Sequence, residues 1–414
     1  MHTAVKKDRT KYVCVVMFVM MTASSLALYW SVRLALANWF SKNADLSGAL
    51  HAMTLAPGNE EYMRRAAELS DEAGGNGTAY YKKAVKVDPY ASGDWVQLGL
   101  HAERDGQYRQ AEQCLQQALR VDRLFEPAWA LANFYFRRED PTNTLHWAHK
   151  SLSVGEGDVT AVFRLCWQTA PDSRRILRDA IPNRASILAQ YLEFLLATDR
   201  FNEAFPVATN LASIAGKNQV NPLLEYCNHA LAVGALECAA TVWNVLARRH
   251  FIPGRPITAN PVHVVANPTF DIAPTGYGFD WKLSVPGGVL ADSGGPDGLR
   301  IEFSGKQPDS SVLLSQYVRL VPKARYRLAV RYQSEDIAQG TGLRWRVLNP
   351  NTGRDVENSE VNLPSGNGME PYAHFTDPPD LRWGLLQLLY ERTPGTNRIE
   401  GSLRLISIDI AAER

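Results

Sequence analysis

The sequence predicts a multidomain protein, first helical and then β, with a transmembrane helix at its N-terminus. Three patterns support this fold class. Residues 12–32 carry no charge, helical hairpin motifs recur about every 34 residues up to residue 250, and alternating hydrophobic residues dominate beyond residue 263. About 20 apolar residues suffice to span a bilayer as a helix. The other two periodicities are typical of amphipathic helices and of half-buried strands.

Composition narrows the class of function. The chain has 414 residues and a formal net charge of +1, with 45% hydrophobic and 21% charged residues. These fractions are ordinary for globular domains. Binding to nucleic acid usually requires a concentrated basic face, which this balance of charge does not favour. We therefore expect no nucleic-acid partner.

The N-terminal region predicts a single-pass anchor. Residues 1–11 form a basic tail with four Lys or Arg residues against one Asp, and the anchor covers residues 12–37. Basic flanks stay on the cytoplasmic side of a membrane. We expect the N-terminus inside, the helix in the inner (cytoplasmic) membrane, and the bulk of the chain in the periplasm or another extracytoplasmic space.

A cleaved signal peptide is the alternative. Ala35-Leu36-Ala37 has the small-x-small form of a cleavage site. However, the apolar run is longer than the 7–15 residues of a signal peptide, and Arg33 would lie just before the cut. An uncleaved anchor is therefore favoured, and mature protein beginning at Asn38 would contradict it.

Residues 41–250 predict stacked helical hairpins. Around the turn at Gly106, hydrophobic and small residues recur at helical spacing on both sides, and Gly99 allows close approach of the two helices. Trp95 and Trp129 are 34 residues apart. A single hairpin cannot bury its apolar face, so stacked neighbours are expected.

From about residue 46 to 250 the chain resembles tetratricopeptide repeats, whose 34-residue unit reads Trp-x2-Leu-Gly-x2-Tyr, then Ala, Phe, Ala and Pro. The unit at 92–125 keeps five of these residues, and units between 157 and 249 are more degenerate. These five are Trp95, Leu98, Gly99, Ala111 and Ala118. The resemblance implies that partner proteins bind in a concave groove. The groove residues it implies are Val96, Leu100, Glu103, Phe134 and Arg137. Packing of Leu100 and Phe134 on the next repeat is the alternative.

A Pro- and Gly-rich linker at 251–262 precedes a β-sandwich at 263–414. Leu328 and Val330, for example, alternate with Arg327 and Arg331. Clusters of Gly, Pro, Asn and Asp separate such runs, as in a sandwich.

This domain resembles the carbohydrate-binding jelly rolls of glycoside hydrolases, in the families numbered four and nine. The matching segments are Asn267–Phe270, Phe279–Trp281, Gly298–Ile301, Gln316–Pro322, Tyr326 and Ile408–Ile410. The resemblance implies glycan binding. It also implies that Asp409 could help to hold a structural calcium with backbone oxygens near the start of the domain. A plain hydrogen-bonded Asp409 is the alternative, and no other cofactor is expected.

Two sets of side chains could contact a glycan. If alternate residues of two strands face outward, and if those strands lie close together in one sheet, four arginines form one basic patch suited to acidic sugars. These are Arg327, Arg331, Arg344 and Arg346. Trp281 and Trp383 could offer stacking faces. A solvated sheet face balanced by loop carboxylates is the alternative.

No motif predicts catalysis. Asp292–Pro296 matches the nucleophile signature of chymotrypsin-like proteases, but no matching His segment precedes it, and a Gly-rich turn explains it. We expect a non-catalytic scaffold that binds proteins through its repeats and a glycan or another subunit through its sandwich. The combination suggests surface polysaccharide assembly or export. An unrecognised glycan-active enzyme and a purely structural sandwich remain alternatives.

Overall fold

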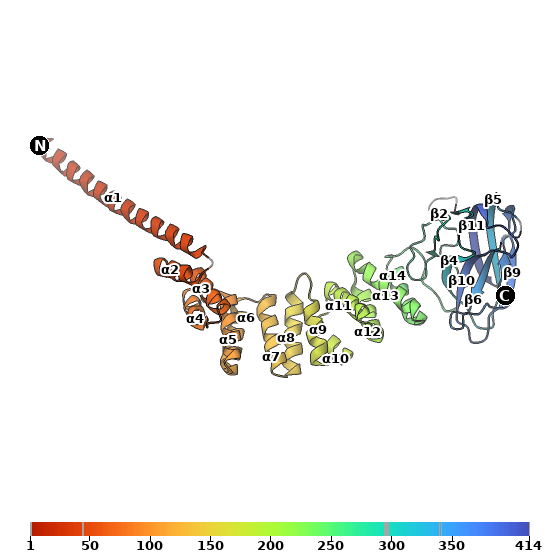
Figure 1. Cartoon of the computed structure of the whole chain (residues 1–414), viewed down its shortest axis with the longest axis horizontal. Coiled ribbons are helices and arrows are strands. Elements are labelled where there is room, and N and C mark those ends of the chain that lie inside the picture. Colours follow the sequence, from red (N-terminus) through yellow and green to blue (C-terminus); the bar gives the residue numbers. More distant parts are fainter. Residues whose placement is uncertain (1, 44, 294–297, 339, 341, 414) are drawn as a thin grey trace. The chain divides into compact units, whose positions relative to one another are not determined.

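The computed structural model describes residues 2–43, 45–293, 298–338, 340 and 342–413. The end of the protease-like signature, residues 294–296, lies outside these ranges. The chain forms two compact units, Met1–Pro182 and Asn183–Arg414. In Figure 1 the elements follow the predicted order, with a long N-terminal helix, paired shorter helices and C-terminal strands.

Helix α1 (His2–Ser41) contains the predicted anchor. Its stretch Tyr12–Ser41 is long and apolar enough to cross a membrane, a test that a signal sequence near the N-terminus also passes. The end of α1 packs on the first hairpin. Ala37 is fully buried there in a cluster with Ala52, Ala56 and Tyr62. The helix is therefore continuous from the apolar segment into the repeat region.

The rest of unit 1 consists of helical hairpins. Consecutive helices pack side by side, as α5 with α6 and α7 with α8 do. The helices are α2 (Leu46–Leu55), α3 (Glu60–Glu72), α4 (Thr78–Val87), α5 (Ser92–Arg104), α6 (Tyr108–Val121), α7 (Phe125–Arg137), α8 (Pro141–Val154), α9 (Thr160–Thr169) and α10 (Ser173–Asp179). Asp45, Asn59 and Asp140 cap helices by accepting backbone N–H hydrogen bonds. The predicted helical hairpins are confirmed.

The hairpin at 92–121 depends on a small residue at its centre. A Cβ added to Gly99 would lie 2.7 Å from the Leu115 side chain, closer than atoms can approach without a shift. Gly106 forms the turn with φ = 76°. Trp95 is only half-buried, and its Nε1 donates to the Pro89 carbonyl at 2.9 Å. Gly99, rather than Trp95, occupies the tightest position.

Unit 2 begins with two further hairpins. Their helices are α11 (Ala185–Ala197), α12 (Phe201–Ile214), α13 (Val220–Ala232) and α14 (Leu236–Arg248), with the 3-10 turn η1 (Lys217–Gln219) between the pairs. The starts of α11 and α13 are 35 residues apart, close to the repeat length. The seven-residue α10 shortens the preceding hairpin, so the start of α11 follows that of α9 by only 25 residues.

The remainder of unit 2 is an antiparallel sandwich of two sheets. One sheet has the order β1 (Lys282–Leu283), β4 (Ser310–Arg319), β10 (Trp383–Glu391), β6 (Leu343–Leu348) and β7 (Val361–Asn362). The other has the order β2 (Val289–Ser293), β3 (Leu299–Ser304), β11 (Glu400–Ala412), β5 (Arg325–Glu335) and β8 (Asn367–Met369), with β9 (Tyr372–Thr376) also on β5. The predicted sandwich is confirmed. One hydrophobic core lies between the sheets and contains alternate residues of β5, such as Leu328 and Val330.

The predicted linker at 251–262 does not divide the compact units. It lies within unit 2 and is held to α14. The Asn244 side chain accepts from the Ile257 backbone N–H at 2.6 Å and donates to the Ile257 carbonyl at 2.9 Å. This pair of hydrogen bonds fixes the path of the linker.

Candidate functional site

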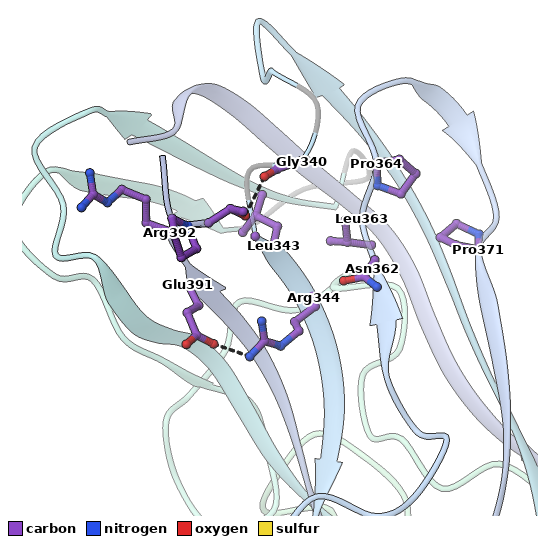
Figure 2. Close-up of a pocket in the computed structure, with 12 residues that line it drawn as sticks. Gly340, Leu343, Arg344, Asn362, Leu363, Pro364, Pro371, Glu391 and Arg392 are labelled. Carbon is purple, nitrogen blue, oxygen red and sulfur yellow. Dashed lines mark hydrogen bonds and ion pairs between the residues drawn. The ribbon is translucent and has the colours of Figure 1, made fainter. Parts of the chain in front are cut away.

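A pocket lies at one end of the sandwich, where β6, β7 and β10 meet neighbouring loops. Its volume is about 720 Å³, which falls within the size range of small-ligand sites. Figure 2 shows Arg344 and Glu391 pointing toward one another on one wall, with Asn362, Leu363 and the two labelled prolines on the other. The lining residues are Gly340, Gly342, Leu343, Arg344, Asn362, Leu363, Pro364, Pro371, Glu391, Arg392, Thr393 and Pro394.

The charged groups of this pocket are held by partners. The Arg344 guanidinium bonds to the Glu391 carboxylate and lies 3.8 Å from Glu360. Arg392 forms an ion pair with Asp309 at 3.2 Å. Such preorganised pairs keep both charge signs at fixed positions, so the pocket offers donors and acceptors to a polar ligand without a strong net charge.

Backbone geometry shapes the pocket mouth. Gly342 has φ = 84°, and a Cβ there would overlap the Glu391 carbonyl. The loop before β6 can therefore approach β10 this closely only because residue 342 is glycine. The Thr393 hydroxyl after β10 donates to the Gly340 carbonyl of the same loop at 2.8 Å.

The predicted patch of four arginines does not exist. Arg327 and Arg331 lie on β5, whereas Arg344 and Arg346 lie on β6, and these strands belong to different sheets. Alternation along each strand is as predicted, but the alternate faces point away from the core on opposite sides of the sandwich. Of these four arginines, only Arg344 lines the pocket.

Each of these arginines also has a partner. Arg331 lies 3.5 Å from Glu370, and Arg346 lies 3.4 Å from Asp355. The Arg327 guanidinium lies 4.8 Å from the centre of the Tyr372 ring. Nearby carboxylates and an aromatic ring thus balance these charges.

The two tryptophans do not offer free stacking faces. Trp281 is fully buried in the sandwich core, and its Nε1 donates to the Asn267 carbonyl at 3.0 Å. Trp383 is 6% exposed, with its ring stacked on Phe279 and covered by the Arg319 guanidinium. Both predictions of a glycan-stacking role are corrected, because packing already occupies the rings.

The predicted groove residues divide into two groups. Val96 and Phe134 are buried in a core cluster between neighbouring hairpins, so they do not line an open groove. Leu100 remains 36% exposed. Glu103 and Arg137 occupy equivalent positions 34 residues apart and form a two-pronged ion pair, with distances of 2.7 and 2.6 Å. The buried positions follow from stacking of consecutive repeats.

Asp409 has a partner other than a metal. Its Oδ2 lies 2.7 Å from His263 Nδ1, and the nearby Asn267 side chain is bonded to the Ile272 backbone. Calcium requires six to eight oxygen ligands. Among the described residues, no group of three or more His, Cys, Asp or Glu side chains could hold a metal. Asp409 is thus hydrogen-bonded to His263, as in the alternative, and its part in holding calcium with backbone oxygens stays a prediction.

Two buried carboxylates were not predicted from the sequence. Asp94 on α5 and Asp377 after β9 are almost completely buried, and neither carboxylate has a hydrogen-bond partner. Burial raises the pKa of Asp94 to about 6 and that of Asp377 to about 7. An Asp in the first turn of a helix and an Asp before Pro-Pro are common in exposed positions, so the sequence carries no sign of their burial.

Comparisons with known proteins place no family on the chain. No family model matches it, and no curated protein matches it. Among solved structures, a CBM4 protein is 15% identical and covers 36% of this chain and 99% of its own, with a TM-score of 0.29.

Two other solved structures cover a larger share of this chain. PilF of Pseudomonas aeruginosa is 15% identical, with coverage of 54% of this chain and 93% of its own and a TM-score of 0.28. YrrB, a TPR protein with an unusual peptide-binding site, is 14% identical, with coverage of 47% and 91% and a TM-score of 0.25. Each of the three covers at most about half of this chain.

Proposed function

We propose that this protein is a non-catalytic scaffold held in the inner (cytoplasmic) membrane by α1, with its N-terminus inside. In this proposal the repeats bind partner proteins, and the sandwich binds a glycan or another subunit on the extracytoplasmic side. The setting that we propose is the assembly or export of surface polysaccharide at the cell envelope.

The observation that best supports the proposed anchor is the packing of α1 beyond its apolar segment. Ala37 is fully buried against the first hairpin, and Arg33 donates to the carbonyls of Thr54 and Leu55 at 3.1 and 2.5 Å. Cleavage after Ala37 would remove both contacts and expose Ala52 and Ala56 to solvent. Retention of α1 is therefore favoured over its removal as a signal peptide.

The orientation of the anchor can be tested with reporters. An enzyme that is active only outside the cytoplasm, fused after Arg414, should be active in cells. A reporter that is active only in the cytoplasm should be inactive at the same position. The reverse pattern would contradict the proposed orientation, because the basic tail would then have crossed the membrane.

Binding of partners through the repeats is supported by side chains that reach the surface of the first helices, with Leu100 and Arg137 the more exposed. Leu100 and the Glu103–Arg137 pair lie on the first helices of consecutive hairpins. Crosslinking from a photoreactive residue at position 100 should capture envelope proteins. The same residue placed at exposed Val233 in the turn after α13 serves as the control. Equal capture from both positions would contradict a groove.

Binding of a glycan is supported by the pocket around Arg344. Sugars need several fixed donors and acceptors, which Arg344, Glu391 and Asn362 supply. A glycan array with the full-length protein in detergent should give signals that Arg344→Gln removes. Arg327→Gln, on the other sheet, should leave the signals unchanged. Loss with both variants, or with neither, would contradict a site in the pocket.

A hydrolytic role has less support in the same pocket. A glycoside hydrolase places two carboxylates about 5–10 Å apart. Among the described residues that line the pocket, Glu391 is the one carboxylate, and it is bonded to Arg344. We therefore propose binding without cleavage. Release of reducing ends from a bound glycan would overturn this part of the proposal.

A second function of the sandwich, as a cap on the last hairpin, has its own support. Glu237 on α14 accepts from Trp383 Nε1 at 3.0 Å and bonds to the Arg319 guanidinium. Trp243 packs edge-on against Phe279, with their ring centres 5.9 Å apart. A terminal repeat needs its apolar face covered. If deletion of residues 263–414 left the repeats soluble and equally stable, the capping role would be wrong.

A further inference from the structure

A second pocket lies between the end of α1 and α3. Its volume is about 210 Å³, small enough for one polar headgroup rather than a chain of sugars. Two lining residues come from α1 and five from α3. They are Asn38, Ser41, Glu61, Tyr62, Arg64, Arg65 and Glu68. The positions 61, 64, 65 and 68 recur at helical spacing, so they share one face of α3.

The walls of this pocket carry both signs of charge. Arg65 and Glu68 lie 3.6 Å apart as a partly exposed pair. Within the described part of the chain, Arg64 and Glu61 form no ion pair. The Arg64 charge acts on Asp94, although that buried carboxylate has no hydrogen-bond partner. Two cations and two anions thus surround a space that is open to one small ligand.

The position of the pocket along α1 indicates its depth. A helix rises about 1.5 Å per residue, so Asn38 lies about 9 Å beyond Val32, the last residue of the uncharged run. The headgroup layer outside the hydrocarbon core is roughly 5–8 Å thick. Trp39, beside Asn38, is 59% exposed, and exposed tryptophans favour the level of the headgroups. The pocket is therefore expected at or just above the headgroups when α1 spans a bilayer.

We propose that this pocket binds the zwitterionic headgroup of a phospholipid with a primary ammonium group, as in phosphatidylethanolamine. Arg64 and Arg65 bind the phosphate, and Glu61 and Glu68 accept from the ammonium N–H groups. A quaternary ammonium has no N–H to donate, and a phosphoglycerol headgroup has no cation. This inference rests on the proposed anchor, because the lipid must reach the pocket from the membrane.

The experiment uses full-length protein in detergent and native mass spectrometry. Three lipids with identical acyl chains are added, namely phosphatidylethanolamine, phosphatidylcholine and phosphatidylglycerol. Phosphatidylethanolamine should be retained roughly tenfold better than either of the others, as expected when one charge-assisted contact is lost. Equal retention of the three lipids would overturn the proposal and leave only ion pairs within the protein.

Paired variants test which side chains bind the ammonium group and which bind the phosphate. Glu61→Gln with Glu68→Gln should abolish the preference for phosphatidylethanolamine over phosphatidylcholine, while Arg64→Gln with Arg65→Gln should weaken retention of all three lipids. Arg178→Gln with Asp179→Asn, an exposed ion pair on α10, is the matched control and should change nothing. Unchanged preference in the first variant would contradict the assignment. Thermal melting of each variant verifies folding.

Two further measurements separate the sources of failure. Soluble O-phosphoethanolamine should compete with the lipid only at much higher concentration. Competition at equal concentration would show that the pocket binds a free phosphate ester and would overturn the lipid assignment. The intact mass of protein from cells reports the anchor independently. A full-length mass together with no lipid preference refutes lipid binding in the pocket alone. The mass of a chain that begins at Asn38 refutes the anchor.

Discussion

The two ends of the helical region are covered in chemically different ways. At the first hairpin, the end of α1 approaches closely through Ala37 and is tied to backbone carbonyls by Arg33. At the last hairpin, the sandwich contacts α14 through the aromatic pair Trp243–Phe279 and the shared acceptor Glu237. Stacked repeats leave an apolar face at each end, and a non-repeat element must cover it. One cover joins the repeats to the anchor, and the other joins them to the sandwich.

Loss of the aromatic contact at the C-terminal end of the helical region should destabilise the protein most. Trp243 is 4% exposed, so Trp243→Ala should lower the free energy of unfolding of unit 2 by about 3–5 kcal/mol. Denaturant titration followed by tryptophan fluorescence and circular dichroism measures this loss. The half-buried Trp95 of unit 1 is the control, and Trp95→Ala should cost less. Equal losses would mean that the aromatic contact adds nothing to the joint.

Each unit contains one buried carboxylate that should make its folding stability depend on pH. Burial raises the pKa of Asp94 from 3.8 to about 6, and that of Asp377 from 3.8 to about 7. The folded chain then binds these protons more tightly than the unfolded chain, so stability falls as pH rises from about 4 and levels off above these pKa values.

Asn at either position removes this penalty. Asp94→Asn and Asp377→Asn should each stabilise the protein by roughly 1–3 kcal/mol at pH 8, and the gain should vanish near pH 4. The first should raise the melting temperature of unit 1, and the second that of unit 2. A gain that does not depend on pH would show that the charge of the carboxylate is not the cause.

A smaller effect is expected at the N-terminal end. Ala37→Leu adds volume where Ala52, Ala56 and Tyr62 leave none, so it should cost about 1–3 kcal/mol. Ala35→Leu is a suitable control from the same small-x-small segment, because Ala35 is exposed. Melting of full-length protein in detergent provides the measurement. If the two substitutions behaved alike, α1 would not pack on the first hairpin.

The smallest effect is expected from the shared carboxylate. Glu237→Gln keeps an acceptor for Trp383 but loses the charge opposite Arg319. The Glu237 side chain is 61% exposed, so solvent screens the ion pair and the loss should be about 0.5–1 kcal/mol. Comparison of melting curves at low and high salt measures the contribution of this ion pair to stability. A loss as large as that of Trp243→Ala would reverse the ranking of contacts at this joint.

Local patterns predicted the elements well. The spacing of Trp95 and Trp129, the small residue at Gly99 and the alternation around Leu328 reflect neighbours along one helix or strand, so periodicity reports them directly. The anchor segment follows from its length and lack of charge.

Long-range neighbours were harder to predict. Nothing in the alternation of Arg331 or Arg346 says that β5 and β6 belong to different sheets, because sheet order depends on pairing between distant strands. The sequence around Trp383 predicts a glycan-stacking residue, whereas in the structure α14 supplies its hydrogen-bond partner, Glu237, 146 residues away. Asn362 and Glu391 meet at the pocket for the same reason, and their local sequence carries no sign of it.

The intact mass of the protein purified from membranes shows whether α1 is retained. A chain with a C-terminal affinity tag is expressed from its own start, extracted with detergent and weighed. Retention of α1 in the folded protein predicts a mass that includes residues 12–37, with the protein remaining in membranes after an alkaline wash. The mass of a chain that begins at Asn38, recovered from the soluble fraction, would contradict retention of α1.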